Sequence, residues 1–257
     1  MSAPLLQAKA LTRRYALPRT SLFKPAPDLV AVNSASFSLH RGETLGVVGE
    51  SGSGKSTLAR MVMAFEAPDE GHILFEGQDL NAVSSQELRR LRRRFQMVFQ
   101  DPFGSLDPRR SIGWSIAEPL RAMGEDSKAR VDEALEQVGL TASVAGRYPH
   151  EFSGGQRQRV AIARAIVTRP ALLVADEAVS ALDVSVQAQI LNLLLDLQDE
   201  LGLGILFISH DMAVVASICD TLLVMQHGHT LEAGPAHEVL NAPTHEYTRS
   251  LLKAAKA

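Results

Sequence analysis

The octapeptide GESGSGKS, residues 49–56, constrains the fold more than any other part of the chain. It has the pattern G-x-x-x-x-G-K-[S/T], in which flexible glycines let backbone N–H groups turn inwards around a phosphate. A strand-length apolar stretch, TLGVV at 44–48, precedes it, and a helical pattern follows from Lys55. This order predicts a nucleotide site in which Lys55 reaches the β- and γ-phosphates and the Ser56 hydroxyl binds Mg²⁺.

Strands and helices are predicted to alternate along the chain. Three further apolar segments have the length and composition of buried strands: 171–175, 204–209 and 221–225. Apolar side chains at helical spacing lie between them: Leu58, Met61, Val62 and Phe65, closed by Pro68; Val131, Ala134, Leu135 and Val138, capped by Gly139; and Ile190, Leu194, Leu197 and Leu201, ending at Gly202. Such alternation predicts an α/β fold with a mainly parallel sheet.

Two regions interrupt this alternation. Residues 16–29 contain three prolines and are predicted to form a loop between two N-terminal strands. Residues 101–150 hold a turn-rich segment and then a helix, without an obvious strand, which favours an inserted helical lobe. We therefore expect one domain over 1–257, with a catalytic core at 1–100 and 168–257 and a helical subdomain at 101–167.

Composition limits the classes of partner. Lys plus Arg number 26 against 29 for Asp plus Glu, a net charge of −3, which argues against a nucleic-acid-binding protein. Five arginines between 89 and 94 follow a capping box formed by Ser84 and Glu87; we interpret that helix as solvated or partner-facing, with a nucleic-acid footprint as the alternative. The single Cys219 cannot form an internal disulfide, and no apolar run reaches the roughly 18 residues of a membrane helix. We expect a soluble, cytoplasmic protein.

Two strand ends carry candidate catalytic side chains. The segment ALLVADE, 171–177, delivers two carboxylates at the end of an apolar strand, where ligands of open α/β sheets bind. Asp176 suits the Mg²⁺ shell of a P-loop ATPase, and Glu177 is placed to polarise an attacking water. His210 ends the strand of ILFISHD and could sense the γ-phosphate, although an isolated histidine at such a position is often structural.

A second anion-binding turn, SGGQR at 153–157, lies about a hundred residues beyond the first, before a helical segment. Together these motifs resemble those of the ATP-binding cassette (ABC) family over essentially the whole chain. The resemblance implies a P-loop ABC ATPase core with an N-terminal antiparallel β subdomain and an inserted α-helical subdomain. The signature motif of that family is matched by Phe152, Ser153, Gly154, Gly155 and Gln156, with Phe152 where leucine is commoner.

The resemblance also implies a role for each remaining motif. Gln100, in MVFQDP, takes the place of the Q-loop glutamine, which contacts Mg²⁺ or water, so that the metal site comprises Ser56, Gln100 and Asp176. Catalysis is assigned to Glu177, His210 and Gln100. The D-loop at the dimer interface corresponds to Ser180, Ala181, Leu182 and Asp183, and Asp183 can also cap the next helix. ATP binding is assigned to Tyr15, Gly49, Glu50, Ser51, Gly52, Ser53, Gly54, Lys55, Ser56 and Thr57.

Cassettes of this family pair head to tail, so the two anion-binding turns of this chain would hold two different ATP molecules. The longer segments around these motifs are similar to the ATPases of bacterial oligopeptide, dipeptide and nickel importers, and so is the C-terminal segment 232–252. The expected partners are a second cassette (a different chain favoured, a second copy possible), two permease subunits and, indirectly, a solute-binding protein, at the cytoplasmic face of the membrane. Peptides are the first expectation for cargo; nickel, opines, glycosides and other solutes stay open.

Two departures from that branch stand out. Ala178 replaces the usual proline after Glu177, which we expect to loosen the turn, and Glu246 replaces the commoner proline before Tyr247. Two alternatives to a transporter are a soluble cassette ATPase acting on nucleic acid or ribosomes, and an accessory cassette of a phosphonate-breakdown type of enzyme assembly.

Overall fold

The protein is described here from a computed structural model, over residues 3–17, 28–101 and 104–255. Its internal contacts divide it into two compact units, residues 1–85 with 206–257 and residues 86–205. Most of the predicted loop at 16–29 lies outside the described residues. The predicted division into a catalytic core and a helical subdomain at 101–167 stays a prediction.

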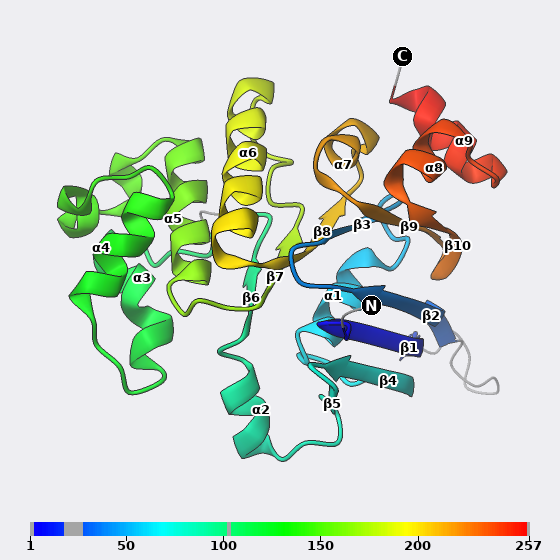
Figure 1. Ribbon diagram of the computed structural model, residues 1–257, viewed down its shortest axis with the longest axis horizontal. Helices are drawn as coiled ribbons and strands as arrows, with labels where there is room; N and C mark the ends of the chain where they lie inside the picture. The colour runs from blue at the N-terminus through cyan, green and yellow to red at the C-terminus, as the bar shows by residue number, and fades with distance from the viewer. Residues whose placement is uncertain (1–2, 18–27, 102–103, 256–257) are drawn as a thin grey trace. The chain divides into compact units, whose positions relative to one another are not determined.

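The first unit contains a mixed sheet. Its strands are β1 (Leu6–Ala16), β2 (Asp28–Leu39), β3 (Thr44–Val48), β4 (Glu70–Phe75), β5 (Gln78–Asp79), β9 (Thr221–Gln226) and β10 (His229–Pro235). They lie in the order β5-β4-β1-β2-β10-β9-β3. The pairs β4/β5, β1/β4 and β1/β2 are antiparallel, as expected for an N-terminal antiparallel part, and Figure 1 shows β4, β1 and β2 side by side. The pair β3/β9 is parallel, so both strands end at the same edge.

The described residues of the first unit form the helices α1 (Lys55–Val62), α7 (Met212–Ile218), α8 (Ala236–Asn241) and α9 (Glu246–Ala254). Leu58, Met61 and Val62 of α1 are fully buried, which follows the predicted apolar stripe. The turn His227-Gly228 joins β9 to β10 as an antiparallel hairpin.

The second unit is mainly helical. Its helices are α2 (Ser85–Leu91), α3 (Ile112–Arg121), α4 (Lys128–Gln137), α5 (Gly154–Ile166) and α6 (Val184–Leu201), with 3₁₀ turns at Ala142–Gly146 and Pro149–Glu151. The strands β6 (Phe95–Val98) and β7 (Leu172–Asp176) are parallel, and β8 (Gly204–Ser209) begins in this unit and ends in the first. Helix α5 packs on α3 and α4, as Figure 1 shows, and Ile112, Ile116 and Leu120 form the buried stripe of α3.

Two predicted helices are too long. Helix α1 ends at Val62 because Ala64 adopts a left-handed conformation, and the N–H groups of Ala64 and Phe65 bond back to Met61 and Arg60, which is a Schellman ending. Phe65, predicted to be on the buried stripe, is 52% exposed. Helix α2 stops at Leu91, so the last three arginines of the predicted helix lie beyond it.

The segment between β10 and α9 is fixed by one carboxylate. Glu232 accepts hydrogen bonds from the Thr244 N–H at 2.8 Å, the Thr244 hydroxyl at 2.9 Å and the His245 N–H at 3.2 Å. Burial opposes ionisation of this carboxyl, but the donated hydrogen bonds from Thr244 and His245 outweigh it and lower the pKa of Glu232. The start of α9 is therefore tied to β10.

Protonation of Glu232 at low pH should weaken the hydrogen bonds that hold the start of α9 to β10. A carboxylate whose pKa is lowered in the folded state stabilises that state above its unfolded pKa, and the contribution is lost as pH falls through the folded value. We expect Glu232→Gln to melt at a lower temperature than the parent at pH 7 and to lose less on acidification below about pH 5. Thermal unfolding between pH 3 and 7 measures this, with the exposed Glu246→Gln as control. Parallel melting curves for parent and Glu232→Gln over the whole range would contradict it.

Candidate functional site

The phosphate loop lies in the first unit, between β3 and α1. Gly49, Gly52 and Gly54 have φ angles of 154°, 79° and 106°, which side chains disfavour. A Cβ on Gly49 would approach the carbonyl oxygen of Met225 to 2.1 Å, and one on Gly54 that of Ala31 to 2.2 Å. Gly49 and Gly54 must therefore be glycine for two reasons: the left-handed backbone conformation and the close approach of neighbouring strands.

Lys55 is the buried cation of this loop. Its side chain is 5% exposed, and its Nζ donates to the carbonyl oxygens of Gly49 at 2.6 Å and Glu50 at 2.8 Å. The ammonium group is therefore held against the backbone of its own loop. The remaining predicted members, Ser51, Ser53, Ser56 and Thr57, belong to the same turn and the first turn of α1.

Tyr15 lies near the end of β1 in the same unit. Its hydroxyl donates a short hydrogen bond to the carboxylate of Glu66, and the Arg13 guanidinium lies 5.1 Å from the ring centroid. The ring is half-buried and held at its edge, which suits a platform for a planar base. Its role in binding adenine stays a prediction.

His210 follows β8 and belongs to the first unit with the phosphate loop. The next residue, Asp211, donates its N–H to the Ser209 hydroxyl at 3.0 Å and caps α7 through Oδ1, which accepts from the Ala213 N–H at 2.8 Å. The backbone on both sides of the exposed His210 is therefore fixed. In the strand order β8 is the neighbour of β3, which leads into the phosphate loop.

The second unit contains the acidic part of the predicted site. Strands β6 and β7 are parallel, and Val98 is in register with Ala175. Gln100 and Glu177 each lie two residues beyond these partners, and the Gln100 Nε2 donates to the Glu177 Oε2 at 2.9 Å. Matched strand ends thus bring together the predicted Q-loop glutamine and the predicted general base.

The turn after β7 is strained and closed. Glu177 has a φ of 49°, a left-handed conformation that is uncommon for residues other than glycine. The Ser180 N–H and hydroxyl both donate to the Glu177 carbonyl, at 3.1 and 3.0 Å. Ala178 is 2% exposed. These contacts hold the turn without the proline that is usual in this family.

The signature segment forms the start of α5. Ser153 is its N-cap: the Gln156 N–H donates to the Ser153 hydroxyl at 3.4 Å, and the Ser153 N–H donates to the Gln156 side-chain oxygen at 3.0 Å. Phe152 is buried under the Arg147 guanidinium, 4.7 Å from the ring centroid. A Cβ on Gly155 would approach the Val186 side chain to 2.5 Å, which explains a glycine here. The capped helix start carries positive partial charge and suits an anion.

The predicted D-loop, Ser180 to Asp183, connects the Glu177 turn to α6. Asp183 is the N-cap of α6, because its Oδ1 accepts from the Val186 N–H at 3.0 Å. The Leu182 N–H donates to the Val179 carbonyl at 3.2 Å, which tightens the segment. Asp183 therefore has the capping role that the sequence allowed, while its place in a dimer interface stays a prediction.

The predicted site residues thus fall into two groups. The first unit holds Tyr15, the phosphate loop and His210, and the second holds Gln100, Asp176, Glu177, the signature and the D-loop. The proposed metal ligands Ser56, Gln100 and Asp176 offer hydroxyl, amide and carboxylate oxygens, the donor chemistry that Mg²⁺ prefers. Within the described residues, His, Cys, Asp and Glu form no cluster of three that would hold a metal by protein ligands alone.

Sequence reasoning missed one residue of the phosphate-loop environment. The Tyr247 hydroxyl, in the first turn of α9, accepts a hydrogen bond from the Glu50 N–H at 3.1 Å. The two residues are 197 positions apart, so no local pattern could connect them.

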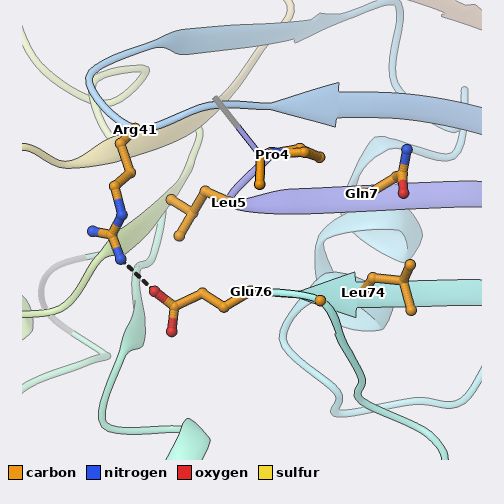
Figure 2. A pocket seen from close by; sticks show the side chains of 8 residues that line it. Pro4, Leu5, Gln7, Arg41, Leu74 and Glu76 are labelled. Atoms are coloured by element: carbon orange, nitrogen blue, oxygen red, sulfur yellow. Dashed lines mark hydrogen bonds and ion pairs between the residues drawn. The ribbon is translucent and has the colours of Figure 1, made fainter. Parts of the chain in front are cut away.

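Two hollows of the first unit contain none of the predicted site residues. One, of about 390 Å³, is lined by Pro4, Leu5, Gln7, Leu74 and neighbouring residues, and Figure 2 shows Arg41 and Glu76 pointing toward one another as an ion pair beside it. The other, of about 530 Å³, lies among α7, α8 and α9. Neither is a candidate for the nucleotide site.

Comparison with known proteins decides the family. The family model described as ABC transporter matches residues 32–180, more than half of the chain. The chain belongs to the ABC transporter family. It is 51% identical over 256 residues to the glutathione import ATP-binding protein GsiA of Salmonella paratyphi A, and 51% over 255 residues to that of Escherichia coli K12. Each match covers 98% of this chain and 41% of the relative, so the chain spans about two fifths of the length of these relatives.

Solved structures agree with this assignment. The cbiO1 subunit of Clostridium perfringens, part of the ABC transporter complex cbiONQ, has a TM-score of 0.80 at 28% identity, over 94% of this chain and 92% of its own. The cassette MJ0796, in a dimeric post-hydrolysis state bound to ADP and Pi, has a TM-score of 0.77 at 26% identity, over 90% of this chain and 98% of its own. These neighbours confirm the predicted P-loop cassette fold. Across the part of the chain that the structure covers, none of the helices has the length and apolar character to span a bilayer.

Asp183 provides a test of local structure that does not depend on a dimer. Asp183→Ala should lower the free energy of unfolding by about 1 kcal/mol, because it removes the cap of α6. Asp183→Asn keeps a side-chain acceptor and should stay within a few tenths of a kcal/mol of the parent, as urea unfolding would show. Equal losses in both variants would mean that the charge, and not the cap, matters.

Proposed function

We propose that this cassette binds and hydrolyses ATP to drive import of peptides or related small solutes through partner permease subunits. Support comes from the relatives at 51% identity, named as glutathione import ATP-binding proteins, and from a structural neighbour bound to ADP and Pi. The observation that carries the hydrolytic part is the hydrogen bond between Gln100 and Glu177 at two matched strand ends. It presents a carboxylate and an amide together beside Asp176.

ATP would be held by the phosphate loop. The turn from Gly49 to Ser56 directs backbone N–H groups inwards, and Lys55 adds a positive charge. The Lys55 ammonium is now bonded to two carbonyl groups of its own loop, and it would exchange these contacts for the β- and γ-phosphates. Tyr15, with its edge held by Glu66, would stack on the adenine.

Hydrolysis would depend on Glu177. Its carboxylate polarises the attacking water, and the left-handed conformation of Glu177 ends the extended backbone of β7 at this residue. Gln100 orients that carboxylate through the 2.9 Å hydrogen bond. His210 would hold the γ-phosphate by a hydrogen bond. Mg²⁺, held by Ser56, Gln100 and Asp176, would neutralise phosphate charge when bound.

A second cassette would complete the site. The capped start of α5 offers Ser153, Gly154 and Gly155 to the γ-phosphate of the nucleotide on the opposite cassette. Binding would therefore favour a closed dimer, and hydrolysis would reopen it, which can move attached membrane subunits. Dimeric cassettes among the structural neighbours support the pairing of two cassettes. For the second cassette we favour a different chain over a second copy. The complex would act at the cytoplasmic face of the membrane.

The alternative of a soluble enzyme assembly is not favoured, because the relatives are named as import subunits. Peptides remain the preferred cargo class, since glutathione is itself a small peptide. The membrane subunits of such importers, and not the cassette, would select among solutes.

Glu177→Gln should bind MgATP as the parent does and hydrolyse it at least about 10²-fold more slowly, since the amide cannot act as a base. The substituted side chain still accepts the hydrogen bond from Gln100, so the local structure should be kept. Steady-state phosphate release and equilibrium binding of a fluorescent ATP analogue measure the two effects.

Two further variants serve as controls for this experiment. Glu133→Gln, which removes a surface ion pair with Arg169 in the same unit, should hydrolyse ATP at the parent rate. Lys55→Ala should lose nucleotide binding itself. Near-normal turnover by Glu177→Gln would refute the role assigned to this carboxylate.

The transport part of the proposal is tested by its partners. We expect the tagged chain, purified from detergent-solubilised membranes of its own host, to bring down two permease subunits, identified by mass spectrometry. A co-purified second cassette would distinguish a heterodimer from a homodimer. Recovery of soluble enzymes alone would refute transport and leave the ATPase chemistry intact.

A further inference from the structure

The first contact that suggests a further role lies at the entry of the phosphate loop. Glu50, the second residue of the loop, donates its backbone N–H to the Tyr247 hydroxyl at 3.1 Å. Tyr247 is 8% exposed, and the hydrogen bond itself is partly buried. A single partly buried hydrogen bond contributes modestly to stability, so its deletion should affect the loop that it fixes more than the whole fold.

The loop needs external supports because its glycines impose little shape of their own. The Gly228 N–H donates to the Ser53 carbonyl at 3.0 Å, and Gly49 and Gly54 pack on the strand carbonyls of Met225 and Ala31. These supports come from β2, from β9 and from the turn between β9 and β10. Tyr247 is the support that comes from the C-terminal helix.

Tyr247 is itself held in place. Its N–H donates to the His245 Nδ1 at 3.1 Å, and His245 donates its own N–H to Glu232 of β10 at 3.2 Å. The path from β10 through His245 to Tyr247 is therefore a chain of direct hydrogen bonds, and Figure 1 shows α8 and α9 together beside β9 and β10. Burial, offset in part by the hydrogen bond from Glu50 and reinforced by the Glu50 carboxylate, raises the pKa of Tyr247, so the phenol stays neutral.

From this geometry we propose that Tyr247 is a positioning residue for the nucleotide, which acts by fixing the Glu50 amide and hence the entry of the phosphate loop. The inference rests on the proposed binding of ATP. A phosphate group must meet several backbone donors at once, so its affinity depends on how well the loop keeps its shape before binding. Tyr247 touches no reacting atom, and hydrolysis at bound ATP should not depend on it.

Tyr247→Phe is the test, because it keeps the ring and its packing and removes only the oxygen. We expect the Kd for MgATP and the KM for ATP to rise about 5-fold, with kcat within about 2-fold of the parent and the melting temperature within about 2 °C. Hydrogen–deuterium exchange in the peptide that contains Glu50 should become faster in the absence of nucleotide.

Ser250→Ala is the matched control. It removes another hydroxyl from α9, one that donates to the Tyr247 carbonyl at 2.7 Å and does not bond the loop. This variant should bind MgATP and exchange at Glu50 as the parent does.

Three results would overturn the proposal. Parent-like affinity and exchange in Tyr247→Phe would show that the hydroxyl does not position the loop. A parallel loss of melting temperature, kcat and affinity would show general support of the fold. A parent chain that binds no MgATP would refute the proposed function as well, whereas the first two results leave that function standing.

Discussion

The close approach of two glycines to strand carbonyls is the constraint on which the nucleotide half of this molecule depends. Gly49 and Gly54 lie so near the carbonyl oxygens of Met225 and Ala31 that a methyl group at either would overlap them. The phosphate loop is therefore seated on β9 and β2 and cannot take its shape alone. Its N–H groups are directed by a sheet that is assembled from both ends of the chain.

A second dependence is the register of β6 and β7. Because Val98 is in register with Ala175, the chain leaves both strands at the same level, and Gln100 reaches Glu177. A shift of one of these strands by one residue would turn its side chains to the opposite face and separate Gln100 from Glu177. The position of Glu177, the proposed general base, is thus a property of strand pairing, and its hydrogen bond with Gln100 reflects that pairing.

Helix caps link structure and function at several points. Ser153 caps α5 at the signature, Asp183 caps α6 at the D-loop, and Asp211 caps α7 beside His210. A cap satisfies backbone donors that would otherwise be unpaired and fixes the direction in which the chain enters the helix. Ser153 and Asp183, which the family resemblance assigns to a nucleotide contact and to a dimer interface, therefore also stabilise the local fold, and their substitution should affect both.

The sequence by itself determined the local elements and the motifs. Short-range periodicity and backbone preferences predicted the strands at 44–48, 204–209 and 221–225, the phosphate loop, a helix after the signature turn and the glycine ending of α6. Prediction from the sequence failed at the end of α1, where the helix ends without glycine or proline. Ala64 takes the left-handed conformation after α1, and Phe65 is exposed as a result. A sequence pattern does not show at which residue such a helix ends, because the left-handed conformation costs a residue other than glycine only about 1 kcal/mol.

Only the tertiary structure decided which distant residues meet. The contact of Glu50 with Tyr247 and that of Gln100 with Glu177 join residues 197 and 77 positions apart. Such contacts depend on strand order, register and helix placement, which are set by burial over the whole unit rather than by any local run of residues. Chemistry was readable from motifs because phosphate binding uses local backbone geometry; support of that geometry was not, because it comes from elsewhere in the chain.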